Sequence, residues 1–97
     1  MKKSYIFVFS NSLGSREEVK QFLDSCSRVS TWRYELTNTY FIVSELSANE
    51  LYELVANHFG VGKGAFIISE YSDNSQGLLN KRSWSLLKNK QLPPKES

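Results

Sequence analysis

Three short stretches of the sequence are apolar at consecutive positions. They cover residues 4–9, 40–43 and 65–68, and after Ser4 none of them contains a polar side chain. A strand with one face in water alternates apolar and polar residues, so an uninterrupted apolar run predicts a strand that is covered on both faces. We therefore expect these stretches to be strands of one sheet whose two faces are both buried.

A fourth stretch, residues 29–36, does alternate, with Arg33 and Glu35 between large apolar side chains. This pattern predicts an edge strand with one wet face. The short link at residues 37–39 leads directly into the strand at residues 40–44. Such a short link between two strands predicts an antiparallel hairpin.

Two helices are predicted by their first residues. Ser15 precedes an apolar stripe with helical spacing, and Glu18 stands three residues later; Ser47 and Glu50 repeat this arrangement further along the chain. A serine followed by a glutamate at this spacing forms a capping box, in which each side chain bonds the other residue's backbone N–H. Gly60 is expected to end the second helix.

The order of the expected elements is strand, helix, strand, strand, helix, strand, with the last strand at residues 65–71. This order predicts one α+β domain, residues 1–77, with a ferredoxin-like βαββαβ arrangement. The four-stranded antiparallel sheet would have the strand order four, one, three, two, with both helices on one face. Residues 78–97 form a C-terminal extension, and we expect its last residues to be disordered.

The first strand has an aliphatic side and an aromatic side. We assign Ile6 and Val8 to the helix side, because aliphatic side chains suit close helix packing, and the aromatic row then faces away. An exposed aromatic patch of this size is unusual on a monomer and predicts a homodimer that buries it. The expected dimer surface consists of Tyr5, Phe7, Phe9, Tyr40 and Phe66, with Trp84 of the extension as a further cover or part of a swapped strand.

Charge is distributed unevenly along the chain. Residues 1–77 carry seven Lys and Arg against nine Asp and Glu, a net charge of −2, whereas residues 78–97 carry five against one, a net charge of +4. A basic segment on an acidic body is typical of a contact with nucleic acid, and the alternative is a solvated charged end. The expected phosphate contacts are Lys81, Arg82, Lys88 and Lys90.

The sequence offers few residues for catalysis. Cys26 is the only cysteine and His58 the only histidine, which excludes an intrachain disulfide, a two-cysteine metal site and a catalytic triad. The glycines of residues 60–64 follow a helix and precede a strand, which is the reverse of a phosphate-binding loop. Among the acidic pairs, Glu70 and Asp73 have no role at a helix start and remain as a candidate Mg²⁺ site.

The chain has no pattern of a membrane or secreted protein. The apolar run after Met1, Lys2 and Lys3 is too short for a secretory signal, and no apolar stretch is long enough to span a bilayer. We therefore expect a cytoplasmic protein without membrane contact.

Three segments resemble a known family. Residues 31–43, 46–51 and 64–70, with a tryptophan, a strand ending near Asn-Thr and a helix start of Leu-Ser-Ala, resemble the ferredoxin-like relatives of CRISPR-associated protein two, stand-alone members included. The resemblance covers residues 4–86 and implies a homodimer, often with an extra strand exchanged between subunits. Some members are metal-dependent nucleases, and others only bridge nucleic acid and protein partners.

The nuclease members of this family carry an aspartate just after the first strand, where this chain has Ser10 or Asn11. Neither residue supplies the negative charge that Mg²⁺ prefers. We therefore expect a non-catalytic accessory protein that binds nucleic acid, a protein encoded nearby, or both, without a cofactor. Two alternatives remain: a metal-dependent endoribonuclease or other nuclease that uses Ser10, Asn11 and Glu70 with Mg²⁺, and a toxin–antitoxin type protein-interaction module.

Overall fold

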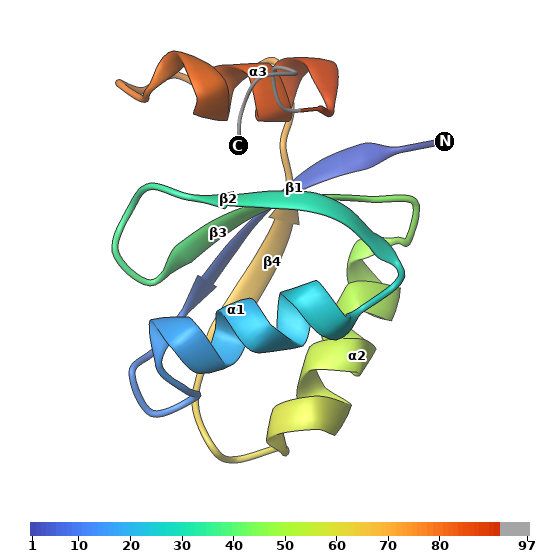
Figure 1. The fold of residues 1–97 in the computed structure, drawn as a ribbon, viewed down its shortest axis with the longest axis vertical. Coiled ribbons are helices and arrows are strands. Elements are labelled where there is room, and N and C mark those ends of the chain that lie inside the picture. Colours follow the sequence, from blue (N-terminus) through green and yellow to red (C-terminus); the bar gives the residue numbers. More distant parts are fainter. Residues whose placement is uncertain (92–97) are drawn as a thin grey trace.

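A computed structural model describes residues 1–91 of the chain, and Figure 1 shows how its elements are arranged. The described residues form one antiparallel sheet and three helices. The strands are β1 (Lys3–Phe9), β2 (Val29–Tyr34), β3 (Thr39–Ser44) and β4 (Phe66–Glu70), and the helices are α1 (Arg16–Ser25), α2 (Ala48–Phe59) and α3 (Lys81–Asn89).

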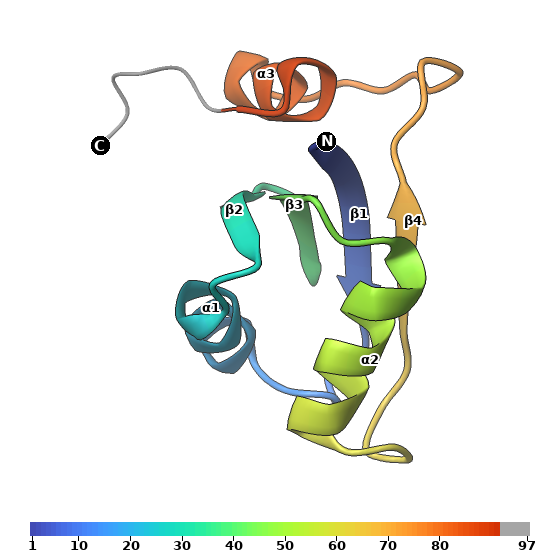
Figure 2. The same ribbon diagram turned by 90° about the vertical axis from the view of Figure 1, so that its right-hand side faces the viewer.

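The elements form three layers with the sheet in the middle. The strand order is β2-β3-β1-β4, and every neighbouring pair is antiparallel. Helices α1 and α2 lie on one side of the sheet and α3 on the other, as Figure 2 shows. The predicted α+β class and ferredoxin-like strand order are confirmed, and α3 adds a third layer.

Both predicted capping boxes are present. The Ser15 hydroxyl accepts the Glu18 N–H at 3.1 Å, and the Glu18 carboxylate accepts the Ser15 N–H at 2.8 Å. Ser47 and Glu50 exchange the same two bonds at the start of α2. Gly60 ends α2 with a φ of +98°, a backbone conformation that favours glycine.

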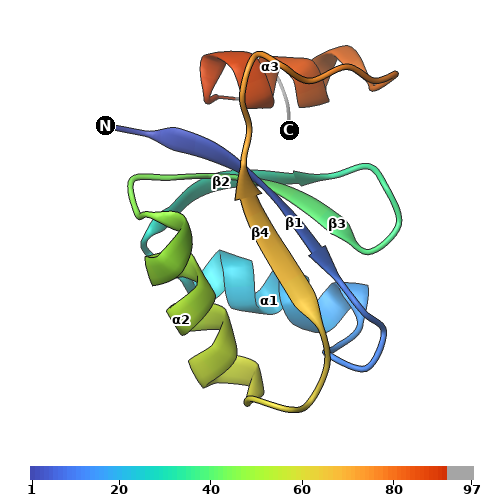
Figure 3. The ribbon, with the colours of Figure 1, turned by 180° about the vertical axis from the view of Figure 1, so that it is seen from behind.

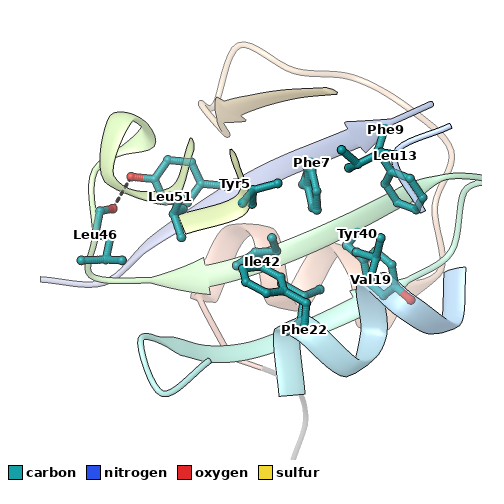
Figure 4. Close-up of a cluster of buried hydrophobic side chains, with 12 residues drawn as sticks. Tyr5, Phe7, Phe9, Leu13, Val19, Phe22, Tyr40, Ile42, Leu46 and Leu51 are labelled. Carbon is teal, nitrogen blue, oxygen red and sulfur yellow. Dashed lines mark hydrogen bonds between the residues drawn. The ribbon is translucent and has the colours of Figure 1, made fainter. Parts of the chain in front are cut away.

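The aromatic row of β1 faces α1 and α2, so the predicted orientation of this strand is wrong. Tyr5, Phe7 and Phe9 are at most 3% exposed and lie between the sheet and these two helices (Figure 4). Alternate residues of a strand point to opposite faces, so Ile6 and Val8 belong to the other side. The expected dimer surface lies largely inside the protomer, because Tyr5, Phe7, Phe9 and Tyr40 are buried there and Phe66 is half-buried against them.

The tyrosine hydroxyls explain why the aromatic side chains suit the helix side. The Tyr5 hydroxyl donates to the Leu46 carbonyl oxygen at 2.6 Å, and the Tyr40 hydroxyl donates to the Arg16 carbonyl oxygen at 2.8 Å. A buried tyrosine needs such a partner for its hydroxyl, and its ring fills more volume than an isoleucine or valine side chain. The rings therefore fill the layer between the sheet and the two helices at the close packing that cores require.

The second face of the sheet is covered by α3, a helix that was not expected from the sequence. Leu86 and Leu87 are at most 2% exposed and pack against Phe41 and Val43 of β3. Trp84 is half-buried and packs against the same cluster. The expected second cover thus comes from the chain's own extension, as a helix rather than a swapped strand. The expected disorder at the chain end concerns residues 92–97, which lie outside the described residues.

The cover by α3 leaves a strip of this face open beside β4. Val8 and Ile67 lie opposite each other in the β1–β4 pair and are 39% and 63% exposed. Figure 3 shows this side of the sheet, with β4 in front and α3 across one end. The strip is therefore apolar surface that the protomer itself does not bury.

Removing apolar volume from α3 is expected to destabilise the fold. Leu86→Ala deletes a fully buried side chain between α3 and β3, and we expect it to lower the free energy of unfolding by about 2–4 kcal/mol. Leu78→Ala, in the same segment but 99% exposed, should change it by less than about 0.5 kcal/mol. Urea denaturation followed by circular dichroism measures both. Two equally small effects would contradict the packing of α3 on the sheet.

Candidate functional site

A polar network joins the start of α3 to the end of β2. The Glu35 carboxylate accepts the backbone N–H of Asn80 at 2.9 Å and the Ser83 hydroxyl, and Arg33 Nε donates to the same hydroxyl oxygen at 2.8 Å. The Asn80 side chain caps the helix by accepting the Arg82 N–H at 2.8 Å. A carboxylate at this position also neutralises the positive end of the helix dipole. The network therefore fixes where α3 begins.

The charged side chains at the end of β2 and just after it do not face water as expected. Arg33 and Glu35 were expected to face water, but both are half-buried and bind Ser83, which is fully buried. The hydrogen bond from Ser83 is the main cause that lowers the pKa of Glu35 below its ordinary value of 4.5. The Asn80 N–H and the positive charge of Arg33 lower this pKa further, and partial burial opposes them.

The far end of α3 is tied to the start of β1. The buried Ser4 hydroxyl donates to the Leu87 carbonyl oxygen at 2.7 Å, and the Ser4 carbonyl oxygen accepts the Tyr71 N–H at 2.9 Å. These bonds join β1, the residue after β4 and the last turn of α3. Because α3 is bonded to the sheet near both of its ends, its outer face has a fixed position relative to the sheet.

The predicted phosphate contacts lie together on or beside α3. Lys81, Arg82 and Lys88 are exposed, and Lys90 is half-buried at the helix end with a φ of +61°. Lys81 and Lys88 are seven residues apart, so they lie on the same side of the helix about 10 Å apart along its axis. Trp84 lies between them in the sequence, and Lys88 Nζ is 5.0 Å from the centre of its indole ring.

The segment that contains α3 carries positive charges only. Residues 78–91 contain four Lys and Arg and no Asp or Glu. The described part of the extension therefore concentrates positive charge on the outer layer of the molecule, while residues 1–77 carry a net charge of −2. This asymmetry favours contact with an anionic surface on the α3 side.

The candidate nuclease residues Ser10 and Asn11 hold loops together. The Ser10 hydroxyl accepts the Ala65 N–H at 2.9 Å, at the approach to β4. The Asn11 side-chain oxygen accepts from the Asn38 side-chain nitrogen at 2.8 Å, at the turn between β2 and β3. Both side chains thus have structural partners within the protomer.

The third candidate, Glu70, lies far from the other two within one protomer. Glu70 is opposite Tyr5 in the β1–β4 pair, and Ser10 is five residues further along the chain. At the rise of a strand this separates Glu70 from Ser10 by about 16 Å. Across residues 1–91, no group of three or more His, Cys, Asp and Glu side chains is placed to hold a metal ion.

The residues that anchor α3 were not predicted from the sequence, namely Ser4, Glu35 and Ser83. Ser4 and Glu35 carry no local signal, because their partners lie 83 and 48 residues away along the chain. The helix itself had a signal. Asn80 is a favoured helix cap, and the buried positions Ser83, Leu86 and Leu87 follow at helical spacing.

No protein-family model, no curated protein and no solved structure matches this chain. The resemblance to the CRISPR-associated protein two superfamily therefore stays a prediction. None of the helices formed by residues 1–91 combines the length and the apolar character needed to cross a bilayer.

The anchoring role of Glu35 predicts a pH-dependent effect. Because the pKa of Glu35 is lower in the folded state than its ordinary 4.5, the ionised side chain stabilises the fold near neutral pH, and this contribution is lost as the pH falls through the folded-state pKa. Glu35→Gln should lower the free energy of unfolding by about 1–2 kcal/mol at about pH 7, with a smaller difference from the wild type at about pH 3.

The control for this measurement is Glu45→Gln, at an exposed position between β3 and α2. It should change the free energy of unfolding by less than about 0.5 kcal/mol at about pH 7. Chemical denaturation of the three proteins at both pH values gives the comparison. A Glu35→Gln effect that does not shrink at the lower pH would contradict the role given to the carboxylate charge.

Proposed function

We propose that this chain is a non-catalytic nucleic-acid-binding protein whose contact surface is the outer face of α3. The observation that carries the proposal is a basic helix held against the sheet near both ends, with Lys81, Arg82 and Lys88 exposed. Lysine and arginine side chains at fixed positions are the groups that proteins use to bind phosphates.

The charge distribution supports this orientation. Residues 78–91 carry a net charge of +4 and residues 1–77 one of −2, which favours the approach of a polyanion to the α3 side. Binding through lysines to phosphates depends on charge and little on base sequence. The proposed activity is therefore general nucleic-acid binding that weakens steeply as salt increases.

Removing two lysines from α3 tests the contact surface. Lys81→Ala combined with Lys88→Ala should lower the affinity for a short DNA duplex about ten- to hundredfold at low salt. Because each lost phosphate contact reduces the slope of log affinity against log salt by about 0.9, the double variant should have a slope smaller by about 1.8. Fluorescence anisotropy at several salt concentrations measures both quantities.

The matched control removes the same charge elsewhere, with Lys20→Ala on α1 combined with Lys63→Ala in the loop before β4. Its affinity should stay within about threefold of the wild type, because these lysines lie outside the proposed contact. Equal losses in the two double variants would contradict α3 as the contact surface. Wild-type protein that binds no duplex at low salt would contradict the proposal as a whole.

We further propose that the protein forms a homodimer, and that the open edge of β4 is its contact. Ser10 and Tyr71 donate backbone N–H groups across the β1–β4 pair to Ala65 and Ser4, so the odd-numbered residues of β4 bond to β1. The alternation of antiparallel pairing then directs the N–H and C=O groups of Phe66, Ile68 and Glu70 to the open edge. No strand formed by residues 1–91 pairs with that edge.

Three features favour a second copy as the partner of this edge. With Ile68 on a two-fold axis, Phe66 of each chain lies opposite Glu70 of its partner, and all five residues of β4 pair. The edge has no proline, and residues 66–69 carry no charge that would discourage pairing. A second chain along this edge would also shield the exposed apolar strip at Val8 and Ile67.

A lysine on the strip tests this dimer. Ile67→Lys places a charge beside the β4 edge, where it is expected to prevent pairing, so the variant should sediment as a monomer at tens of micromolar. The control Val61→Lys makes a similar change at a loop residue that is 86% exposed, and it should stay dimeric like the wild type. Sedimentation velocity measures all three. A wild type that is a clean monomer under these conditions refutes the dimer.

A further inference from the structure

An apolar cavity lies between α3 and the segment that leads into it. Its volume is about 370 Å³, and its walls include Ile6, Phe41 and Leu87 from the sheet and α3, together with Tyr71 and Trp84. This volume is in the range of sites that hold small organic groups. The cavity therefore offers space and an apolar surface directly beside the basic helix.

A second, polar hollow of about 450 Å³ adjoins the cavity. It shares Tyr71, Gln76 and Trp84 with the apolar cavity and adds Lys88 and Asp73. The rings of Tyr71 and Trp84 stand edge to face at 6.4 Å, and Lys88 Nζ lies 5.0 Å from the Trp84 ring centre. A ligand that spans both hollows would meet flat apolar walls in one and the opposite charges of Lys88 and Asp73 in the other.

We propose that this double cavity binds one nucleobase of a single-stranded nucleic acid, with the adjoining phosphate at Lys88. A nucleotide has this combination of a flat, weakly polar ring and a negative charge a few bonds away. Aromatic side chains beside basic residues are the usual means of binding single strands without strong sequence preference. Asp73 lines the same polar hollow as Lys88, and its carboxylate repels phosphate but can accept a ring or amino N–H of a base. This favours the phosphate at Lys88 and the polar edge of the base at Asp73.

A single strand is then the preferred ligand of this protein, which rests on the proposed binding of nucleic acid through α3. In a duplex the bases are stacked and paired, so they do not reach a cavity in a protein surface. In a single strand an unstacked base is accessible. On this proposal a duplex binds through the lysines alone, and a single strand binds through the lysines together with the cavity. An apolar side chain of a protein partner is the competing occupant.

The test uses the fluorescence of Trp84. Trp32→Phe leaves Trp84 as the only tryptophan, because the chain has two. In this background an oligothymidylate of about eight nucleotides should quench Trp84 and bind about tenfold more tightly than a duplex at equal phosphate concentration. Tyr71→Leu should remove most of this preference and leave the duplex affinity unchanged. Tyr52→Leu, on the opposite side of the sheet, should change neither affinity.

The outcomes separate the two proposals. If the duplex and the single strand bind equally and Trp84 fluorescence does not respond to the single strand, the cavity inference is overturned while binding through α3 stands. If neither nucleic acid binds at low salt, both proposals fail. Loss of single-strand preference in Tyr71→Leu together with an unchanged preference in Tyr52→Leu supports the cavity. Equal losses in both variants overturn it.

Discussion

The structure depends on burying both faces of the two central strands. The β1 and β3 side chains are apolar in both directions, so a sheet with helices on one side only would leave Phe41 and Val43 in water. Helix α3 removes this surface from water, and its position follows from that requirement. The basic outer layer and the cavity beside Trp84 exist because α3 lies there.

Local sequence signals predicted most of the fold, but no such signal showed which face of β1 points toward α1 and α2. The capping boxes at Ser15 and Ser47 are complete within four residues, and the most apolar strands had to be central. After Ser4 both sides of β1 are apolar, so one small polar residue was the only mark of its outer face, and side-chain size gave the wrong answer. The deciding partners of the Tyr5 and Tyr40 hydroxyls are backbone carbonyl groups 41 and 24 residues away.

The sequence showed the charge of the candidate site but not its structure. The excess of Lys and Arg after residue 77 was evident, but a charged segment of this kind has the same composition as a solvated chain end. Glu35 fixes this segment to the sheet as a helix, because its carboxylate accepts hydrogen bonds from the Asn80 N–H and the Ser83 hydroxyl. A lone glutamate on an alternating strand normally indicates a wet face, and only the folded chain shows that the face is covered by a helix.

The same packing also limits where a binding function can be located. The layer between the sheet, α1 and α2 is filled by the aromatic row, and the loop residues Ser10 and Asn11 bond to other loops. These groups stabilise the fold. The α3 layer differs, because its inner side chains bind the sheet while its lysines project outward beside an apolar cavity. In a chain whose aromatic strands form its own core, the exposed basic groups and the apolar cavity thus lie on and beside the helix that covers the sheet.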